Sequence, residues 1–362
     1  MRAAAIKAAK RAALLTGKRV GLFNAVSRSR WRRQRLLILC YHGIAQSDEN
    51  LWNPQLYFNA GLFRERLTIL RRGGYSVLPL GEALDRLGSG SLPRRSVVIT
   101  FDDGHSDFMT VAHPILREFG FPCTIYLTTY HVDDNVPIFA LVVSYMLWKA
   151  RGRSIDLAPW MGVGDGVTSL ATEAGRAAAH RSLVRFAEDN ELDSRDKQAL
   201  AQQLANSLGV DFDDVRRRRI LHLLNANEVR RLARDGVDFQ LHTHCHRAPK
   251  DEAKYREQIR LNRDRICSLT GMEPVHFCYP SGVVHRSFLP WLSAEGVRSA
   301  VTCVPGLATP GSPPLLLPRL LDHEGLSAIE FGAWLDGLGE WLPRSAKTAR
   351  AAGIQDVAES YS

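Results

Sequence analysis

Two neighbouring carboxylates end one short apolar stretch of the chain. Asp102 and Asp103 directly follow the β-branched run 97–101, and Gly104 comes after them. Such a run is typical of a buried strand, and side chains alternate along a strand, so the two aspartates can point in different directions. One of them can bind a cation while the other works beside it. Asp-Asp-Gly is also common where a strand simply ends in a turn, so this motif alone does not define a site.

A second group of residues with metal chemistry lies far along the chain. His242, His244 and His246 fall within five residues, after the apolar stretch 236–239. A spacing of four puts His242 and His246 on one face of a helical turn, which is a spacing that zinc sites use. Two imidazoles and one carboxylate leave a position for water on the metal, as in catalytic sites. Two alternatives remain: His244 could replace a neighbouring histidine, and Cys245 could bind zinc, although a thiolate suits a structural site better.

These motifs resemble those of a known family. Residues 100–104 and 242–246 resemble the first two motifs of the polysaccharide deacetylases, a group similar to the nodulation-factor (NodB-type) chitooligosaccharide deacetylases. Residues 37–44 resemble the entry strand of that family, and 275–282 resemble its third motif. Many members carry an arginine where this chain has Cys278. The resemblance covers roughly residues 37–130 and 225–325.

The resemblance implies a hydrolase that removes N-acetyl groups from a polysaccharide, an oligosaccharide or a lipid-linked glycan. Asp103, His242 and His246 would hold one divalent metal, for which we predict zinc because it suits imidazole with carboxylate. Asp102 would act as the general base toward a water whose pKa the metal lowers.

Further site residues follow from the resemblance. The predicted substrate and oxyanion residues are Tyr279, Ser281 and Arg319. The oxyanion donor is expected to be a backbone N–H near Ser281, and Arg319 is expected to orient Asp102 through an ion pair or to be structural.

The general acid is less well marked in the sequence. The late histidine motif of the family is not found, and His323 is the nearest candidate for protonating the leaving amine. His42 ends a predicted strand, where it either faces the mouth of the site or caps the strand.

The elements that must position these residues alternate between strand and helix. This alternation predicts an α/β architecture with the active residues at the carboxyl ends of strands. The resemblance specifies a distorted (β/α) barrel of the polysaccharide deacetylase type. We predict a basic N-terminal extension (1–36), a catalytic domain (37–344) with a mainly helical insertion (131–225), and a polar C-terminal tail (345–362). The four arginines at 216–219 indicate a solvated helix face or a contact for an anionic substrate.

The charge is distributed unevenly along the chain. The net charge is +9, and residues 1–36 contain 11 Lys or Arg and no Asp or Glu, so the remainder carries 9 − 11 = −2. A slightly acidic body argues against a nucleic-acid partner. A basic helix over residues 3–15 could lie on an anionic membrane surface, or it could be a solvated extension, an ordinary packed helix or a basic tail for nucleic acid.

Location and redox state are predicted from the same composition. We predict a cytoplasmic protein, peripheral at the inner membrane face if the N-terminal helix binds there. The six scattered cysteines are expected to be free thiols, and the oligomeric state is left open.

Two other functions compete with the deacetylase. A catalytically impaired relative would bind a glycan or a protein partner, as Cys278 and the absent late histidine motif suggest. An amidohydrolase acting on a non-sugar amide would use the same site on a different substrate.

Overall fold

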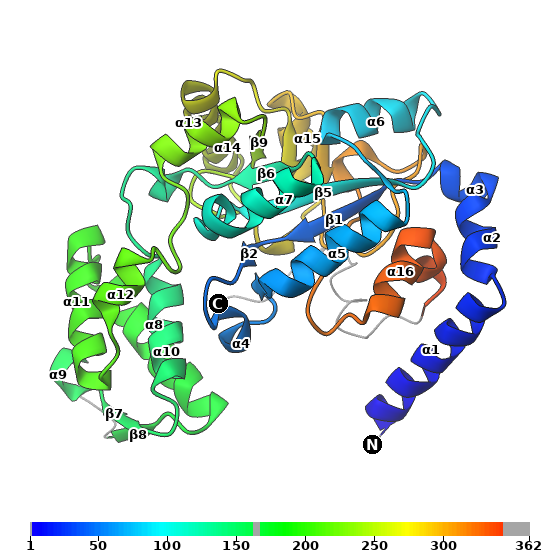
Figure 1. Cartoon of the computed structure of the whole chain (residues 1–362). Helices are drawn as coiled ribbons and strands as arrows, with labels where there is room; N and C mark the ends of the chain where they lie inside the picture. Colours follow the sequence, from blue (N-terminus) through cyan, green and yellow to red (C-terminus); the bar gives the residue numbers. More distant parts are fainter. Residues whose placement is uncertain (1, 162–166, 343–362) are drawn as a thin grey trace.

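A computed structural model describes residues 2–161 and 167–342. Figure 1 shows a body built around a curled sheet, with a group of helices at one end and the N-terminal helices at the other. The predicted tail 345–362 and residues 162–166 lie outside the described residues. The division into an extension, a catalytic domain and a tail stays a prediction.

The central sheet has eight strands, and all of its strand pairs are parallel. Seven strands run in the order β11-β10-β9-β6-β5-β1-β12, and β4 also pairs with β5. A parallel bridge between Val301 and Leu317 links β11 to the segment that leads into β12, so it joins the two ends of the sheet. The predicted distorted α/β barrel is confirmed. The strands are β1 (Leu37–Tyr41), β4 (Ser76–Val77), β5 (Ser96–Asp103), β6 (Thr124–Leu127), β9 (Asp238–Leu241), β10 (His276–Cys278), β11 (Ser299–Val301) and β12 (Leu320–Leu321).

The strands are apolar on both faces because helices cover the outside of the barrel. All five residues of β1 are buried, as are the first seven of β5. In α5, Phe63, Leu67 and Leu70 are buried at the helical spacing of the sequence, and Asn59 caps the helix by accepting the N–H of Leu62. The helices of the body are α5 (Ala60–Arg72), α6 (Leu80–Gly88), α7 (His113–Phe119), α13 (Ala226–Arg234), α14 (Glu252–Thr270), α15 (Phe288–Ala294) and α16 (Ala328–Asp336).

The helical insertion has an apolar core of its own. It contains α8 (Phe139–Lys149), α9 (Ala158–Met161), α10 (Glu173–Asp189), α11 (Ser194–Leu208), α12 (Phe212–Arg217) and the antiparallel pair β7 (Ser154–Asp156) and β8 (Val167–Ser169). Its buried side chains form a cluster that also takes in Ala45 and Tyr57 from the body. Arg216 and Arg217 pair with acids of their own helix, in accord with a solvated helix face.

Short elements connect the barrel to this insertion. The parallel pair β2 (Gly43–Ile44) and β3 (Tyr57–Phe58) flanks α4 (Glu49–Trp52) just beyond β1. η1 (Phe108–Ala112) is a short π-helix, and the 3₁₀ helices are η2 (Tyr130–Val132), η3 (Pro280–Gly282), η4 (Pro314–Leu316) and η5 (Leu338–Trp341).

Three helices precede the barrel: α1 (Arg2–Arg19), α2 (Leu22–Arg28) and α3 (Arg30–Arg33). Leu14 and Phe23 are buried against residues of α16 and η5. The buried Arg32 donates to the carbonyl oxygens of Leu335 and Ser96, which fixes this segment to the body. Among the described residues, no helix combines the length and the apolar character needed to cross a membrane.

Candidate active site

The two aspartates stand at the carboxyl end of β5. Asp102 is buried, while Asp103 is partly exposed and adopts the left-handed conformation with φ 68°. Gly104 follows with φ 84°, and a Cβ there would lie 2.4 Å from Leu127 Cδ1, so the turn requires glycine. The chain therefore leaves the strand abruptly and separates the two carboxylates.

Asp103, His242 and His246 converge on one point. Asp103 Oδ1 lies 3.1 Å from His242 Nε2 and 3.2 Å from His246 Nε2. The ligand atoms of the three residues all lie within 4.8 Å of one another. Two ligands of a tetrahedral zinc, at metal distances of about 2.1 Å, lie roughly 3.4 Å apart. The spacing of these atoms therefore fits one small divalent cation.

The hydrogen bond on the far side of His242 supports the same conclusion. His242 Nδ1 lies 2.8 Å from the carbonyl oxygen of Cys278, which can only accept. Nδ1 must then carry the hydrogen, so in the neutral imidazole the lone pair on Nε2 faces the Asp103 carboxylate. A lone pair and a carboxylate repel each other unless a cation lies between them, and metal-binding histidines commonly use such a carbonyl partner. The donor set thus fits a metal.

The histidine loop is not the helical turn that the spacing predicts. Residues 242–249 form an irregular loop after β9, in which Thr243 and His246 have positive φ angles of 61° and 53°. That loop, rather than a helix face, brings His242 and His246 together. His244 instead lies with Nδ1 2.9 Å from Thr129 Oγ1, and neither it nor Cys245 belongs to the Asp103 cluster.

Strained backbone is concentrated at the site. Nine non-glycine residues of the described chain have positive φ, and four of them lie in these loops. The four are Asp103, Thr243, His246 and Ser281. Such conformations cost free energy and persist where the surrounding structure imposes them, as at binding and catalytic sites.

Asp102 is held by a buried arginine. The Arg319 guanidinium binds both of its carboxylate oxygens, at 2.7 Å and 2.6 Å. Burial alone would raise the pKa of Asp102, but the charge and hydrogen bonds of Arg319 hold it well below its ordinary value. Asp102 is therefore a carboxylate at neutral pH. Arg319 is fully buried, so it contacts Asp102 and does not reach a substrate.

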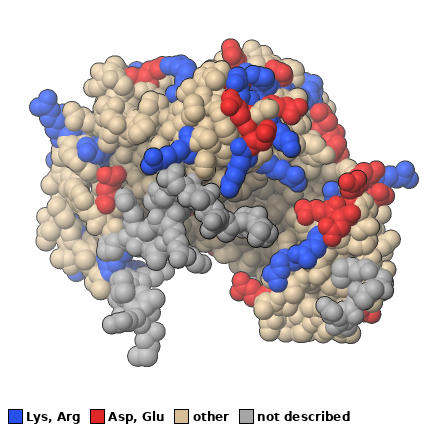
Figure 2. All heavy atoms as spheres, turned by 180° about the vertical axis from the view of Figure 1, so that it is seen from behind, with Lys and Arg blue, Asp and Glu red and all other residues tan. Residues whose placement is uncertain are grey.

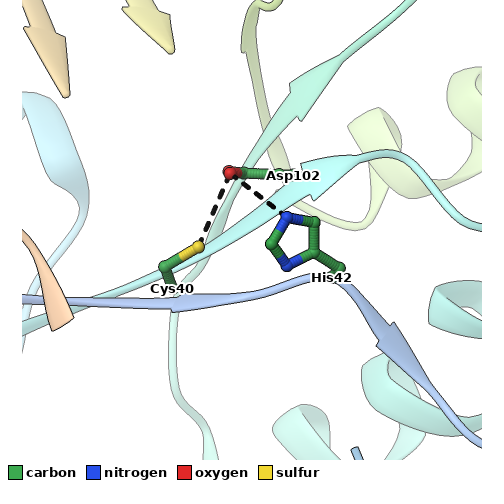
Figure 3. Close-up of side chains that lie close together, drawn as sticks. All are labelled: Cys40, His42 and Asp102. Carbon is green, nitrogen blue, oxygen red and sulfur yellow. Dashed lines mark hydrogen bonds and ion pairs between the residues drawn. The ribbon is translucent and has the colours of Figure 1, made fainter. Parts of the chain in front are cut away.

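Two residues from the end of β1 also face Asp102. Figure 3 shows Cys40 and His42 directed toward its carboxylate, with Cys40 Sγ at 3.5 Å and His42 Nε2 at 3.8 Å. These three side chains could also hold a cation by their spacing. Since Arg319 already neutralises Asp102, the Asp103 cluster is the better metal site. His42 thus faces the site, which decides between the two roles that the sequence left open.

The two predicted residues of the third motif, Tyr279 and Ser281, differ in what they can offer a substrate. The buried Tyr279 donates its hydroxyl to the carbonyl of Leu315, so this hydroxyl is not directed at a substrate. Ser281 is exposed, and its backbone N–H has no partner among the described residues. The open N–H agrees with the expected oxyanion donor. Cys278, in place of the usual arginine, has its Sγ 3.4 Å from Asp102 Oδ2 and 3.1 Å from an Arg319 nitrogen.

His323 lies in the loop after β12. Its Nδ1 accepts the N–H of Gly325, and no contact to Asp102 is found for it within the described residues. The preceding Asp322 is buried and bonded to Arg66 and Tyr41. The role of His323 as a general acid stays a prediction, and the geometry favours His42.

Two supporting residues were missed by the sequence analysis. His105 is fully buried, with Nε2 3.4 Å from Asp103 Oδ2 and Nδ1 3.1 Å from the Tyr57 hydroxyl. Asn262 of α14 accepts the N–H of His242 and so fixes the start of the histidine loop. The position of His105 beside the Asp-Asp-Gly turn was a usable signal, whereas Asn262 carries no local signal.

The class of the protein follows from comparison with known proteins. A family model described as polysaccharide deacetylase matches residues 89–174 and 195–300, together just over half of the chain. The chain belongs to the polysaccharide deacetylase family, as its motifs predicted.

Individual relatives match only part of their length. Poly-beta-1,6-N-acetyl-D-glucosamine N-deacetylase from Escherichia coli (strain K12) is 29% identical over 93 residues, 25% of this chain and 14% of the relative. A putative polysaccharide deacetylase, YxkH, from Bacillus subtilis is 35% identical over 94 residues, 26% of this chain and 32% of the relative. An N-deacetylase of the same name as the first, from Staphylococcus aureus, is 27% identical over 118 residues, 29% of this chain and 40% of the relative. These matches thus span well under half of each relative's length.

Solved structures share the fold. The deacetylase PplD from Streptococcus pyogenes superposes with a TM-score of 0.54 at 19% identity, covering 84% of this chain and 97% of that one. IcaB from Ammonifex degensii superposes with a TM-score of 0.51 at 17% identity, covering 83% and 97%. At these identities the likeness establishes the barrel and not the substrate.

Proposed function

We propose that the protein is a metal-dependent hydrolase that removes N-acetyl groups from an amino-sugar glycan. The observation that carries the proposal is the pairing of two adjacent carboxylates with different surroundings. Asp103 faces two histidine nitrogens at 3.1 Å and 3.2 Å, whereas Asp102 is held ionised by Arg319. A three-residue ligand set with a neighbouring base is suited to the hydrolysis of an amide at neutral pH.

Zinc is the metal that we propose for Asp103, His242 and His246, because two imidazoles and one carboxylate suit it. When bound, zinc would polarise the acyl oxygen and lower the pKa of a water molecule. The chain's own contribution is to fix the three ligands through strained loops and through the hydrogen bond from His242 to Cys278.

The remaining side chains can move the proton that the reaction needs. Hydrolysis forms a carbon–oxygen bond to water and breaks the carbon–nitrogen bond, so a proton must pass from the water to the leaving nitrogen. Asp102 can take that proton, since Arg319 keeps it ionised. Burial lowers the pKa of His42, so His42 holds no spare proton at neutral pH; it lies 3.8 Å from Asp102 and can take the proton from that carboxyl group and pass it to the nitrogen. The open N–H of Ser281 would stabilise the developing oxyanion.

The substrate class comes from the relatives. The matched proteins of E. coli and S. aureus are named as deacetylases of poly-beta-1,6-N-acetyl-D-glucosamine. We propose an N-acetylglucosamine polymer or oligomer, free or linked to a lipid, as the substrate of this chain.

Acetate release tests the proposal. Zinc-reconstituted protein would be assayed on β-1,6- and β-1,4-linked N-acetylglucosamine oligomers, beside Asp102→Asn and His42→Ala. Arg217→Ala, on the exposed face of α12, is the matched control. We expect release that a chelator abolishes and zinc restores, that Asp102→Asn lowers by about 10²- to 10⁴-fold, and that Arg217→Ala leaves unchanged.

Failure would take two distinguishable forms. One bound zinc per chain without acetate release would contradict the glycan substrate and favour a non-sugar amide or a glycan-binding protein, which an assay across acyl amides separates. No bound zinc would contradict the metal site itself.

A further inference from the structure

The helices α1–α3, called here the N-terminal arm, carry one sign of charge. Residues 1–36 hold 11 Lys or Arg and no acid, while the rest of the chain has a net charge of −2. Figure 2 shows Lys and Arg with few acidic side chains on the side where these helices lie, whereas the opposite side shows both signs. The protein is therefore strongly polarised from one end to the other.

Apolar side chains are exposed among these basic residues. Leu15, Val20 and Leu22 are 41%, 75% and 45% exposed. They are three of the ten large apolar side chains exposed in the described parts of the chain, and they fall within eight residues. Exposed apolar residues scattered singly need no explanation, but a cluster of them does.

The cluster is interleaved with cations at helical spacing. Arg11, Leu15 and Lys18 follow one another at intervals of four and three along α1, so they share a face. Arg19 precedes Val20 and Leu22 at the turn into α2. Arg11, Lys18 and Arg19 are exposed, and no ion pair engages them within the described residues.

The arm is anchored to the body, and its exposed basic face lines one side of an open hollow that Ile69 and Asp336 of the body also line. On its inner side Lys10 pairs with Glu330 at 3.1 Å, and Leu14 and Phe23 are buried. The exposed basic and apolar side chains are thus presented on helices that are anchored to the body.

From these observations we infer that the exposed basic and apolar side chains of the N-terminal arm dock on the surface of an anionic lipid bilayer. Lysine and arginine near such a surface are attracted to acidic headgroups, and apolar side chains between them enter the boundary with the acyl chains. A nucleic acid would satisfy the cations but would leave Leu15, Val20 and Leu22 in water. The combination of both features favours the bilayer.

Docking there would turn the candidate site away from the membrane. The arm packs at the start of β5, through Arg32 to Ser96 and Arg95 to Ser27. Asp102 and Asp103 end the same strand of eight residues, about 20–23 Å further on at roughly 3.3 Å per residue. The metal site would face the aqueous side, where glycan extends from the surface.

Vesicle sedimentation of the full chain tests the inference. The vesicles would contain phosphatidylcholine alone or equal parts of phosphatidylcholine and phosphatidylglycerol. We expect binding to the anionic vesicles that falls with added salt, and little binding to the neutral ones. Lys18→Glu with Arg19→Glu should lower the partition coefficient by at least about tenfold, and Leu15→Ser with Leu22→Ser should lower it at both low and high salt.

The matched control reverses two exposed cations elsewhere, Arg216→Glu with Arg217→Glu on α12. It should bind anionic vesicles like the wild type, and melting temperatures show that every variant is folded. Equal binding by the Lys18/Arg19 variant, or no binding to anionic vesicles, would overturn the inference. Displacement of the protein from the vesicles by a DNA duplex that binds through Lys18 and Arg19 would also overturn the inference. The test does not depend on the deacetylase reaction.

Discussion

The barrel end that carries the site and the helical insertion beside it bury polar groups in opposite ways. At the barrel end, ionised side chains are buried beside opposite charges, as Asp102 is with Arg319 and Asp322 with Arg66. The insertion packs Ala, Leu and Val, and Nδ1 of its buried His222 lies 3.0 Å from the backbone carbonyl oxygen of Ile220.

This difference in how polar groups are buried assigns function to the barrel end and stability to the insertion. Buried ion pairs contribute little net stability, since the cost of desolvation offsets the attraction between the charges. The barrel end therefore keeps its charges for a purpose other than stability, and the insertion has the composition of a supporting wall. Variants in the two regions should differ accordingly, with lost chemistry in the first and lost stability in the second.

The largest effect is expected for Asp103→Asn. The amide keeps the shape of the carboxylate but removes the charge that balances a cation between His242 and His246. We expect zinc binding to fall below one per chain and acetate release to be lost. Atomic absorption on the purified variant measures the metal, and normal zinc content would contradict this ligand set.

Asp102→Asn should separate the base from the metal. Zinc should stay at one per chain, while acetate release falls by about 10²- to 10⁴-fold, the usual contribution of a general base. The variant also leaves Arg319 buried without its counter-charge, which costs about 3–5 kcal/mol. Arg319→Met in the Asp102→Asn background should recover stability but not activity. Recovery of activity in the double variant would exclude Asp102 as the base.

The sequence predicts those parts of the site that are local in the chain. Asp102 with Asp103 and His242 with His246 each belong to one short motif next to an apolar strand, so residue type and spacing suffice to propose them. The reason given for the histidines was nevertheless wrong, since a loop with positive φ angles, and not a helical turn, brings them together. A spacing of four residues does not specify which backbone produces the contact.

The remaining contacts depend on how the barrel closes. Arg319 meets Asp102 across 217 residues because β12 pairs with β1 and β1 pairs with β5. The register that sets Cys40 beside Thr100 brings Cys40 and His42 toward Asp102. Neither the register of distant strands nor the path of the loops between them is encoded in a local pattern, so these partners required the structure.

In the insertion, Leu204→Ala should act on stability first. Leu204 is fully buried in the separate apolar cluster of this region. Truncation of a buried leucine typically costs about 2–5 kcal/mol. We expect a lower melting temperature by calorimetry, with zinc binding at room temperature unchanged. Loss of zinc from the folded variant would show that the insertion helps to position the ligands.

The smallest effect concerns the pH dependence of His222. Burial lowers its pKa from 6.5 to about 4, so the folded protein holds it neutral. Below pH 6.5 the unfolded chain binds a proton that the folded chain resists, so stability falls as the pH drops from 6.5 to 4. The shift corresponds to at most about 3 kcal/mol. In His222→Gln this part of the dependence should vanish, so that the stability curves of wild type and variant converge or cross toward pH 4. Parallel curves in denaturant titrations would mean that His222 is already protonated in the fold, and that the insertion buries charge as the barrel end does.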